Sequence, residues 1–138
     1  MVLLAVGALV AGLIGTAGAQ SPGRSSTVEI TQRDFRFHAN VTSVPAGTVT
    51  FRVHNRGPST HEFNVDRTEL PDGRLPLRLD GLTVNEDSAL LHRIDSLNGV
   101  SYQGTDELTV HLKPGHYVLY CNLEGHYLGG MHVSLTVR

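Results

Sequence analysis

The sequence predicts an all-β sandwich, because short runs of alternating apolar residues recur along the chain and are separated by turns that contain glycine or proline. About seven such runs are present, and this number with this punctuation is typical of an antiparallel two-sheet sandwich. The exception is the middle of the chain, roughly residues 71–104, where we expect a long crossover connection that contains one short helix.

The predicted strands are defined by apolar residues at every second position, which gives each strand one face to bury. In chain order these positions are Val28/Ile30, Phe35/Phe37, Val49/Phe51/Val53, Phe63/Val65, Leu108/Val110/Leu112, Tyr117/Leu119/Cys121 and Val133/Leu135/Val137. Predicted turns lie at Pro45-Ala46-Gly47, Asn55-Arg56-Gly57-Pro58 and Lys113-Pro114-Gly115.

The helix is predicted inside the crossover, after a turn at Pro71-Asp72-Gly73. Asn85 is a candidate N-cap, and Asn98-Gly99 would end the helix. The apolar residues between these signals fall on one helical face; they are Leu90, Leu91, Ile94 and Leu97. We interpret this face as cover for the core.

The first 19 residues contain no charged side chain and end in Ala17-Gly18-Ala19, a pattern that predicts a signal peptide cleaved before Gln20. No Lys or Arg precedes the apolar stretch, so an uncleaved membrane anchor is the alternative. Residues 20–26 are predicted to be a flexible lead-in, and residues 27–138 to form a single domain. We therefore expect an exported protein, either periplasmic or extracellular.

The charge balance argues against several classes of partner. The chain has 11 Lys and Arg against 13 Asp and Glu, a net charge of −2, and no basic cluster. Nucleic acid is not expected as a partner, and neither is a membrane unless the N-terminal segment is uncleaved. The single cysteine, Cys121, is unusual in an exported chain and predicts a free thiol, an intermolecular bridge or a metal ligand.

Metal ligation is favoured by the residues that follow this cysteine. Cys121, His126 and Met131 lie on one predicted loop between two strands. A thiolate, an imidazole and a thioether form a soft donor set that suits copper, and a second histidine would complete the arrangement used for electron transfer. His61 is the candidate, because it shares strand parity with Phe63 and Val65, whose side chains are predicted to face the core.

Two segments, residues 44–65 (VPAGTVTFRVHNRGPSTHEFNV) and residues 113–137 (KPGHYVLYCNLEGHYLGGMHVSLTV), resemble the cupredoxin family. The Cys-x4-His-x4-Met spacing is most similar to that of rusticyanin- and sulfocyanin-type members. The resemblance implies a Greek-key sandwich with one type 1 copper ion per chain, bound by His61, Cys121, His126 and Met131. It also implies one-electron transfer outside the cytoplasm.

Two features are expected to shape how such a carrier works. A transient redox protein partner would dock near His126, where Tyr127 and Leu128 are expected to form an apolar rim. Asn122 stands where copper enzymes with an internal electron relay have a histidine, so this relay is not expected. No nucleophile with an orienting base is recognisable, and we do not expect an enzyme.

Other interpretations stay open at the level of sequence. The protein could store or deliver copper, or it could keep the sandwich and bind a partner without metal. Cys121 and Met131 could be core residues, and His61 and His126 could be ordinary structural or surface histidines. A second metal site among His111, His116 and His132 is a further alternative.

Overall fold

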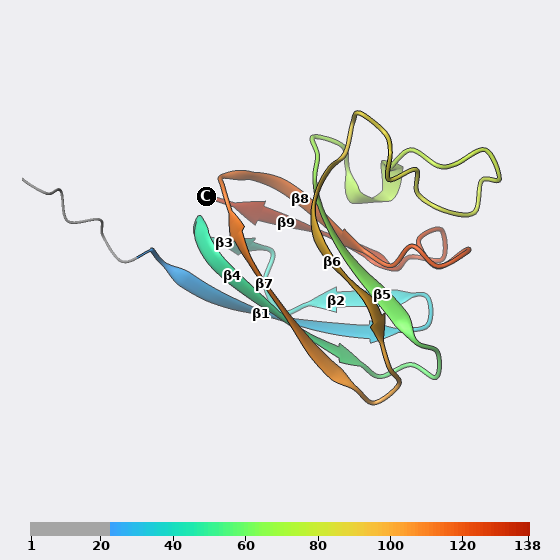
Figure 1. The fold of residues 1–138 in the computed structure, drawn as a ribbon, viewed down its shortest axis with the longest axis horizontal. Coiled ribbons are helices and arrows are strands. Elements are labelled where there is room, and N and C mark those ends of the chain that lie inside the picture. Colours follow the sequence, from blue (N-terminus) through green and yellow to red (C-terminus); the bar gives the residue numbers. More distant parts are fainter. Residues whose placement is uncertain (1–22) are drawn as a thin grey trace, which may run out of the picture.

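The computed structural model describes residues 23–138. The predicted signal peptide, residues 1–19, and the first part of the lead-in lie outside the described residues. Nine strands form two packed sheets within the described part of the chain (Figure 1). This two-layer sandwich confirms the predicted fold class.

The first sheet has the strand order β2-β1-β4-β7, and the second has the order β3-β9-β8-β5-β6. The first is built from β1 (Ser25–Arg33), β2 (Arg36–Ala39), β4 (Gly47–Asn55) and β7 (Thr105–Leu112). The second is built from β3 (Ser43–Val44), β5 (His61–Arg67), β6 (His92–Val100), β8 (Gly115–Tyr120) and β9 (His132–Val137). Most pairings are antiparallel, as the sequence predicts, and two of them, β1 with β4 and β3 with β9, are parallel.

The main core lies between the sheets and consists of the alternating residues that the sequence singles out. Val49, Phe51 and Val53 of β4 are fully buried, and Phe63 and Val65 of β5 face them from the other sheet. The prediction is wrong for Phe35, which lies in the turn between β1 and β2 and is 55% exposed.

A second apolar cluster lies on the opposite face of β8, under the crossover between β5 and β6. Val118 and Tyr120 of β8 pack there against crossover residues, which include Leu75, Val84 and Leu91. Strand β8 is therefore buried on both faces, which holds the residue that follows it, Cys121, in a rigid setting.

The predicted helix over residues 85–97 is wrong. Asn85 lies in a turn of the crossover, and residues 92–100 form β6, which pairs antiparallel with β5. The helical element within the described chain is a short 3₁₀ turn at Asp72–Arg74. The pairing register shifts at two places, so that β6 has one more residue than β5 at each of them. Because of these irregularities, Ile94 and Leu97 pack against the same core. They are three positions apart, a spacing that is also typical of one face of a helix.

The strand order brings three chain segments to one end of the second sheet. β5 is antiparallel to β8, and β8 is antiparallel to β9. The start of β5, the end of β8 and the start of β9 therefore meet, and these positions carry His61, Cys121 and Met131. No helix among residues 23–138 has the length and apolar character needed to cross a membrane.

Candidate metal centre

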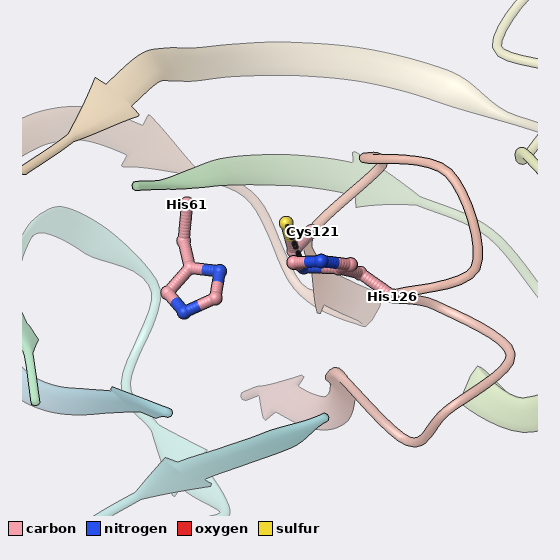
Figure 2. A group of neighbouring side chains, drawn as sticks. All are labelled: His61, Cys121 and His126. Atoms are coloured by element: carbon pink, nitrogen blue, oxygen red, sulfur yellow. Dashed lines mark hydrogen bonds between the residues drawn. The ribbon is translucent and has the colours of Figure 1, made fainter. Parts of the chain in front are cut away.

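Three of the four predicted ligands converge on one point. Each of His61, Cys121 and His126 offers one ligand atom, and these atoms lie within 4.8 Å of one another (Figure 2). The Cys121 sulfur lies 3.7 Å from Nδ1 of His126. His61 and Cys121 are fully buried, and His126 is partly exposed.

His61 is positioned by the turn that joins β4 to β5. The buried side chain of Asn55 donates hydrogen bonds to the carbonyl oxygens of Ser59 (2.7 Å) and Val100 (2.8 Å). Its own oxygen accepts a hydrogen bond from the Gly57 amide at 2.9 Å. These bonds fix the chain just before His61, so the imidazole enters the site from a rigid strand end.

The loop from Cys121 to Met131 is closed by its own backbone hydrogen bonds. The Cys121 amide donates to the Met131 carbonyl and the Met131 amide donates to the His126 carbonyl, each at 3.1 Å. Gly130 has a backbone φ of 107°, which residues other than glycine rarely adopt. At Gly129, a Cβ atom would overlap the ring of Phe35. The loop therefore needs glycine at both positions to turn back toward Cys121.

Met131 lies beside Cys121 in the main core cluster and is fully buried. It directly precedes β9, and its backbone pairs with that of Cys121. Met131 stays the predicted fourth ligand.

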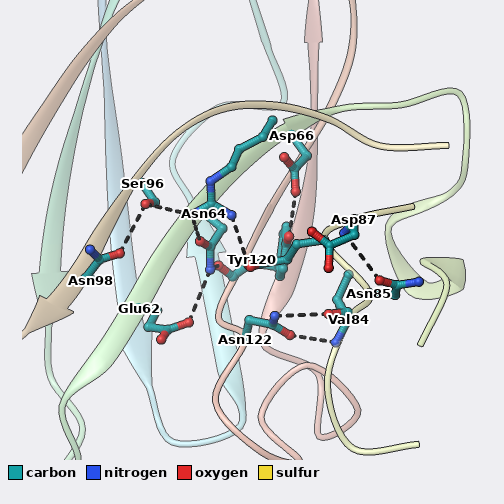
Figure 3. Close-up of polar contacts among 12 residues, drawn as sticks. Glu62, Asn64, Asp66, Val84, Asn85, Asp87, Ser96, Asn98, Tyr120 and Asn122 are labelled. Atoms are coloured by element: carbon teal, nitrogen blue, oxygen red, sulfur yellow. Dashed lines mark hydrogen bonds and ion pairs between the residues drawn. The ribbon is translucent and has the colours of Figure 1, made fainter. Parts of the chain in front are cut away.

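The residues on either side of Cys121 are locked by polar contacts (Figure 3). The Tyr120 hydroxyl donates to Asp66 at 2.5 Å, and both side chains are buried. Burial raises the pKa of Asp66 and that of Tyr120. The Asn122 side chain bonds to both backbone groups of Val84, at 2.6 and 3.2 Å. Asn122 thus ties the loop to the crossover.

Burial shifts the pKa values of both buried ligands, His61 and Cys121. Burial lowers the pKa of His61, so its imidazole is held neutral and has a lone pair for a metal. Burial raises the pKa of the Cys121 thiol, and backbone hydrogen bonds from Leu123 and Glu62 oppose that rise. Because a thiol must lose its proton to bind a metal, a cation is needed to offset the cost of a buried thiolate.

The ring nitrogens of His61 provide a direct test of whether the site suits a metal. Both are buried, and neither has a hydrogen-bond partner among the described residues. Nε2 lies 3.0 Å from Oδ1 of Asp34 with no hydrogen bond formed between them. A buried polar atom without a partner costs about 1–3 kcal/mol. A metal ion bound at Nδ1 would remove one such cost, and the donor set of sulfur and imidazole is the one that copper prefers.

The exposed rim beside His126, predicted to consist of Tyr127 and Leu128, has a different composition in the structure. Tyr127 is only 3% exposed, and its hydroxyl bonds to the backbone of Asp72 and Leu75 in the crossover. It is therefore not part of an exposed rim. Its place is taken by Phe35, whose ring centroid lies 5.2 Å from that of His126, while Leu128 is 52% exposed as expected.

Two of the three histidines suggested for a second metal site have hydrogen-bond partners in the protein. His116 bonds to Thr68 and Ser134, and His132 bonds to Asp72. Within residues 23–138, the group of His61, Cys121 and His126 is the one set of three or more such side chains close enough to share a metal. The alternative of a second site among His111, His116 and His132 therefore has no support from the geometry.

The sequence alone did not indicate Asp34 or Phe35 as parts of this site. They are adjacent residues of the β1–β2 turn, and each contacts one of the two histidines. Neither lies near a ligand in the sequence, so no local pattern marks them.

Comparison with known proteins agrees with this geometry. The family described as "Cupredoxin-like domain" matches residues 3–133, and the chain belongs to this family. No protein with a curated description matches the sequence.

Solved structures with the same fold include two auracyanins and a rusticyanin. Reduced auracyanin from Roseiflexus castenholzii has a TM-score of 0.61 at 22% identity, with 85% of this chain and 99% of that chain covered. Auracyanin A, described as a "blue" copper protein from Chloroflexus aurantiacus, has a TM-score of 0.58 at 22% identity, with 83% and 100% covered. Rusticyanin from Thiobacillus ferrooxidans has a TM-score of 0.59 at 17% identity, with 86% and 85% covered. At these identities the likeness shows the shared fold.

Proposed function

We propose that this protein is a one-electron carrier that holds a single copper ion between His61, Cys121, His126 and Met131. The observation that carries the proposal is the convergence of one cysteine sulfur and two imidazoles within 4.8 Å, in a buried site next to a buried methionine. When bound, copper supplies a one-electron couple between Cu(II) and Cu(I).

The protein's own part is to keep the donor atoms in place. The hydrogen-bonded loop, the turn fixed by Asn55 and strand β8, which is buried on both faces, hold the ligand-bearing segments in place. A rigid donor set changes little between the two oxidation states, which favours fast electron transfer.

A redox partner is proposed to dock over His126, the ligand that reaches the surface. Phe35 and Leu128, both more than half exposed, provide apolar area beside it. Phe35 also has a backbone φ of 60°, which is uncommon for a bulky residue. Such a conformation is kept only where the surrounding structure fixes it, so the Phe35 ring has a defined position. A small and transient interface of less than about 1,200 Å² would suit an electron carrier.

We also propose that the protein is exported and works in the periplasm or outside the cell. The support is the sequence of the first 19 residues, which contain no charged side chain and end in Ala17-Gly18-Ala19. Mass spectrometry of the exported protein tests this, because cleavage predicts a chain that begins at Gln20.

Copper storage or delivery is the second candidate, and the burial of His61 and Cys121 argues against it, because an exchanged ion needs an accessible route. The test is to load the protein with copper and to cycle it between a mild reductant and a mild oxidant in the presence of a Cu(I) chelator. A carrier keeps one copper per chain through repeated cycles. Rapid loss of Cu(I) to the chelator indicates storage or delivery, and failure to bind copper indicates a metal-free binding domain.

A further inference from the structure

A carboxylate lies against the buried histidine of the metal centre. Oδ1 of Asp34 is 3.0 Å from Nε2 of His61, and the His61 side chain is fully buried while that of Asp34 is 29% exposed. Asp34 belongs to the turn between β1 and β2 in the first sheet, whereas His61 begins β5 in the second. The contact therefore links the two sheets at the metal centre.

The carboxylate is held in place by the loop that leads into His61. The Ser59 amide donates to Oδ1 at 3.3 Å, and the Ser59 hydroxyl donates to Oδ2 at 2.9 Å. A Cβ atom at Gly57 would lie 2.6 Å from Oδ1, so only glycine leaves room for the carboxylate there. An anion fixed on two sides in this way has a set position relative to the imidazole.

The position of Asp34 decides which nitrogen of His61 is available. Figure 2 shows one ring nitrogen of His61 turned toward Cys121 and His126 and the other turned away. Since Nε2 lies against Asp34, the nitrogen that faces the site is Nδ1. A neutral imidazole has one proton, and a neighbouring carboxylate favours the tautomer with that proton on Nε2, which leaves the lone pair on Nδ1. The distance of 3.0 Å between Nε2 of His61 and Oδ1 of Asp34 is that of a hydrogen bond.

The charge of Asp34 acts on the two oxidation states differently. A fixed negative charge beside a ligand stabilises the more positive, oxidised ion more than the reduced ion. The two histidines have different neighbours in the β1–β2 turn. His61 lies against the carboxylate of Asp34, and His126 lies against the apolar ring of Phe35.

We propose that Asp34 is a positioning residue of the metal centre, which directs Nδ1 of His61 to the ion and lowers the reduction potential of the bound copper. This inference rests on the proposed function for its copper-dependent part. The contact between Asp34 and His61 does not involve the metal, so it is also tested in the protein without copper.

Three variants separate the roles of Asp34. Asp34→Asn removes the charge and keeps an oxygen acceptor, and Asp34→Ala removes both. Ser59→Ala keeps the carboxylate but takes away one of its anchors, and it serves where an Asp34 variant does not fold. Asp106→Asn is the matched control, because Asp106 is exposed on β7 and loses the same charge.

The metal-free readout is the ¹⁵N chemical shift pattern of the His61 ring. We expect mainly the Nε2–H tautomer in the parent and in Asp106→Asn, and a larger share of the Nδ1–H tautomer in Asp34→Ala. In the copper-loaded protein, we expect a higher potential in Asp34→Asn, and a Cu(II) affinity about ten- to a hundredfold lower in Asp34→Ala. Ser59→Ala should change both properties in the same direction and less strongly.

Two results would overturn the inference. One is an unchanged His61 tautomer in Asp34→Ala, and the other is a potential in Asp34→Asn equal to that of Asp106→Asn. If the parent protein binds no copper, the proposed function fails, and the tautomer measurement still decides whether Asp34 positions His61.

Discussion

The sulfur of Cys121 lies 3.7 Å from Nδ1 of His126. The five-residue spacing allows this because the loop between them is closed by backbone hydrogen bonds and returns to Cys121 through Met131. The donor atoms are thus arranged by the fold. This arrangement leads to four predictions about single side chains and one about the centre as a whole.

Cys121→Ser should abolish the visible absorption of the copper-loaded protein and leave a folded sandwich. The cysteine forms no disulfide, and the core around it is built from many other apolar residues. A buried hydroxyl in its place costs about 1–3 kcal/mol if it finds no partner. Absorption spectra and thermal unfolding measure both effects, and a variant that retains the band would refute the assignment of the sulfur as ligand.

Variants of Met131 should move the reduction potential in opposite directions. A long-range thioether donates weakly to Cu(II) and comparatively well to Cu(I), and Met131→Gln replaces it with a hard amide oxygen that stabilises Cu(II). The potential should fall in Met131→Gln and rise in Met131→Leu, which keeps the apolar volume in the core. Voltammetry on the parent and both variants measures this. Equal potentials would show that Met131 only fills the core.

Phe35→Ala should slow electron exchange with a protein partner and leave the potential unchanged. The ring contacts His126 on the surface and is not a ligand. Loss of one aromatic contact of about 1 kcal/mol lowers the bimolecular rate constant by about fivefold. The control is Leu90→Ala, since Leu90 is 60% exposed and contacts Thr68 just beyond the opposite end of β5 from His61. Equal rate constants in both variants would place the docking surface elsewhere.

Asp66→Asn should become more stable relative to the parent as the pH rises above 3.8. Burial raises the pKa of Asp66 in the folded state, so its stabilising contribution is present below pH 3.8 and is lost as the pH rises through the folded-state pKa. Each pKa unit of elevation corresponds to about 1.4 kcal/mol. The measurement is the difference in unfolding free energy between the two proteins from pH 3 to pH 8. A difference that does not vary with pH would contradict the raised pKa.

The sequence predicts the parts of this protein that depend on local patterns. Alternation marks β4 and β5, and the spacing of Cys121, His126 and Met131 marks the loop, because these features are set by neighbours along the chain. The helix prediction failed because irregular pairing with β5 shifts the apolar residues of β6 out of simple alternation. The contacts of Asp34 and Phe35 depend on how the two sheets pack, and Tyr127 turns inward because the crossover offers it backbone partners. None of these three features leaves a local signal.

The most direct test of the central claim is the absorption spectrum of the oxidised protein after it has been titrated with copper. A Cu(II) ion bound to the Cys121 thiolate gives an intense visible band, which should grow to saturation at one copper per chain and disappear on reduction. A protein that stays colourless at saturation, or that binds copper with no visible band, would contradict the account.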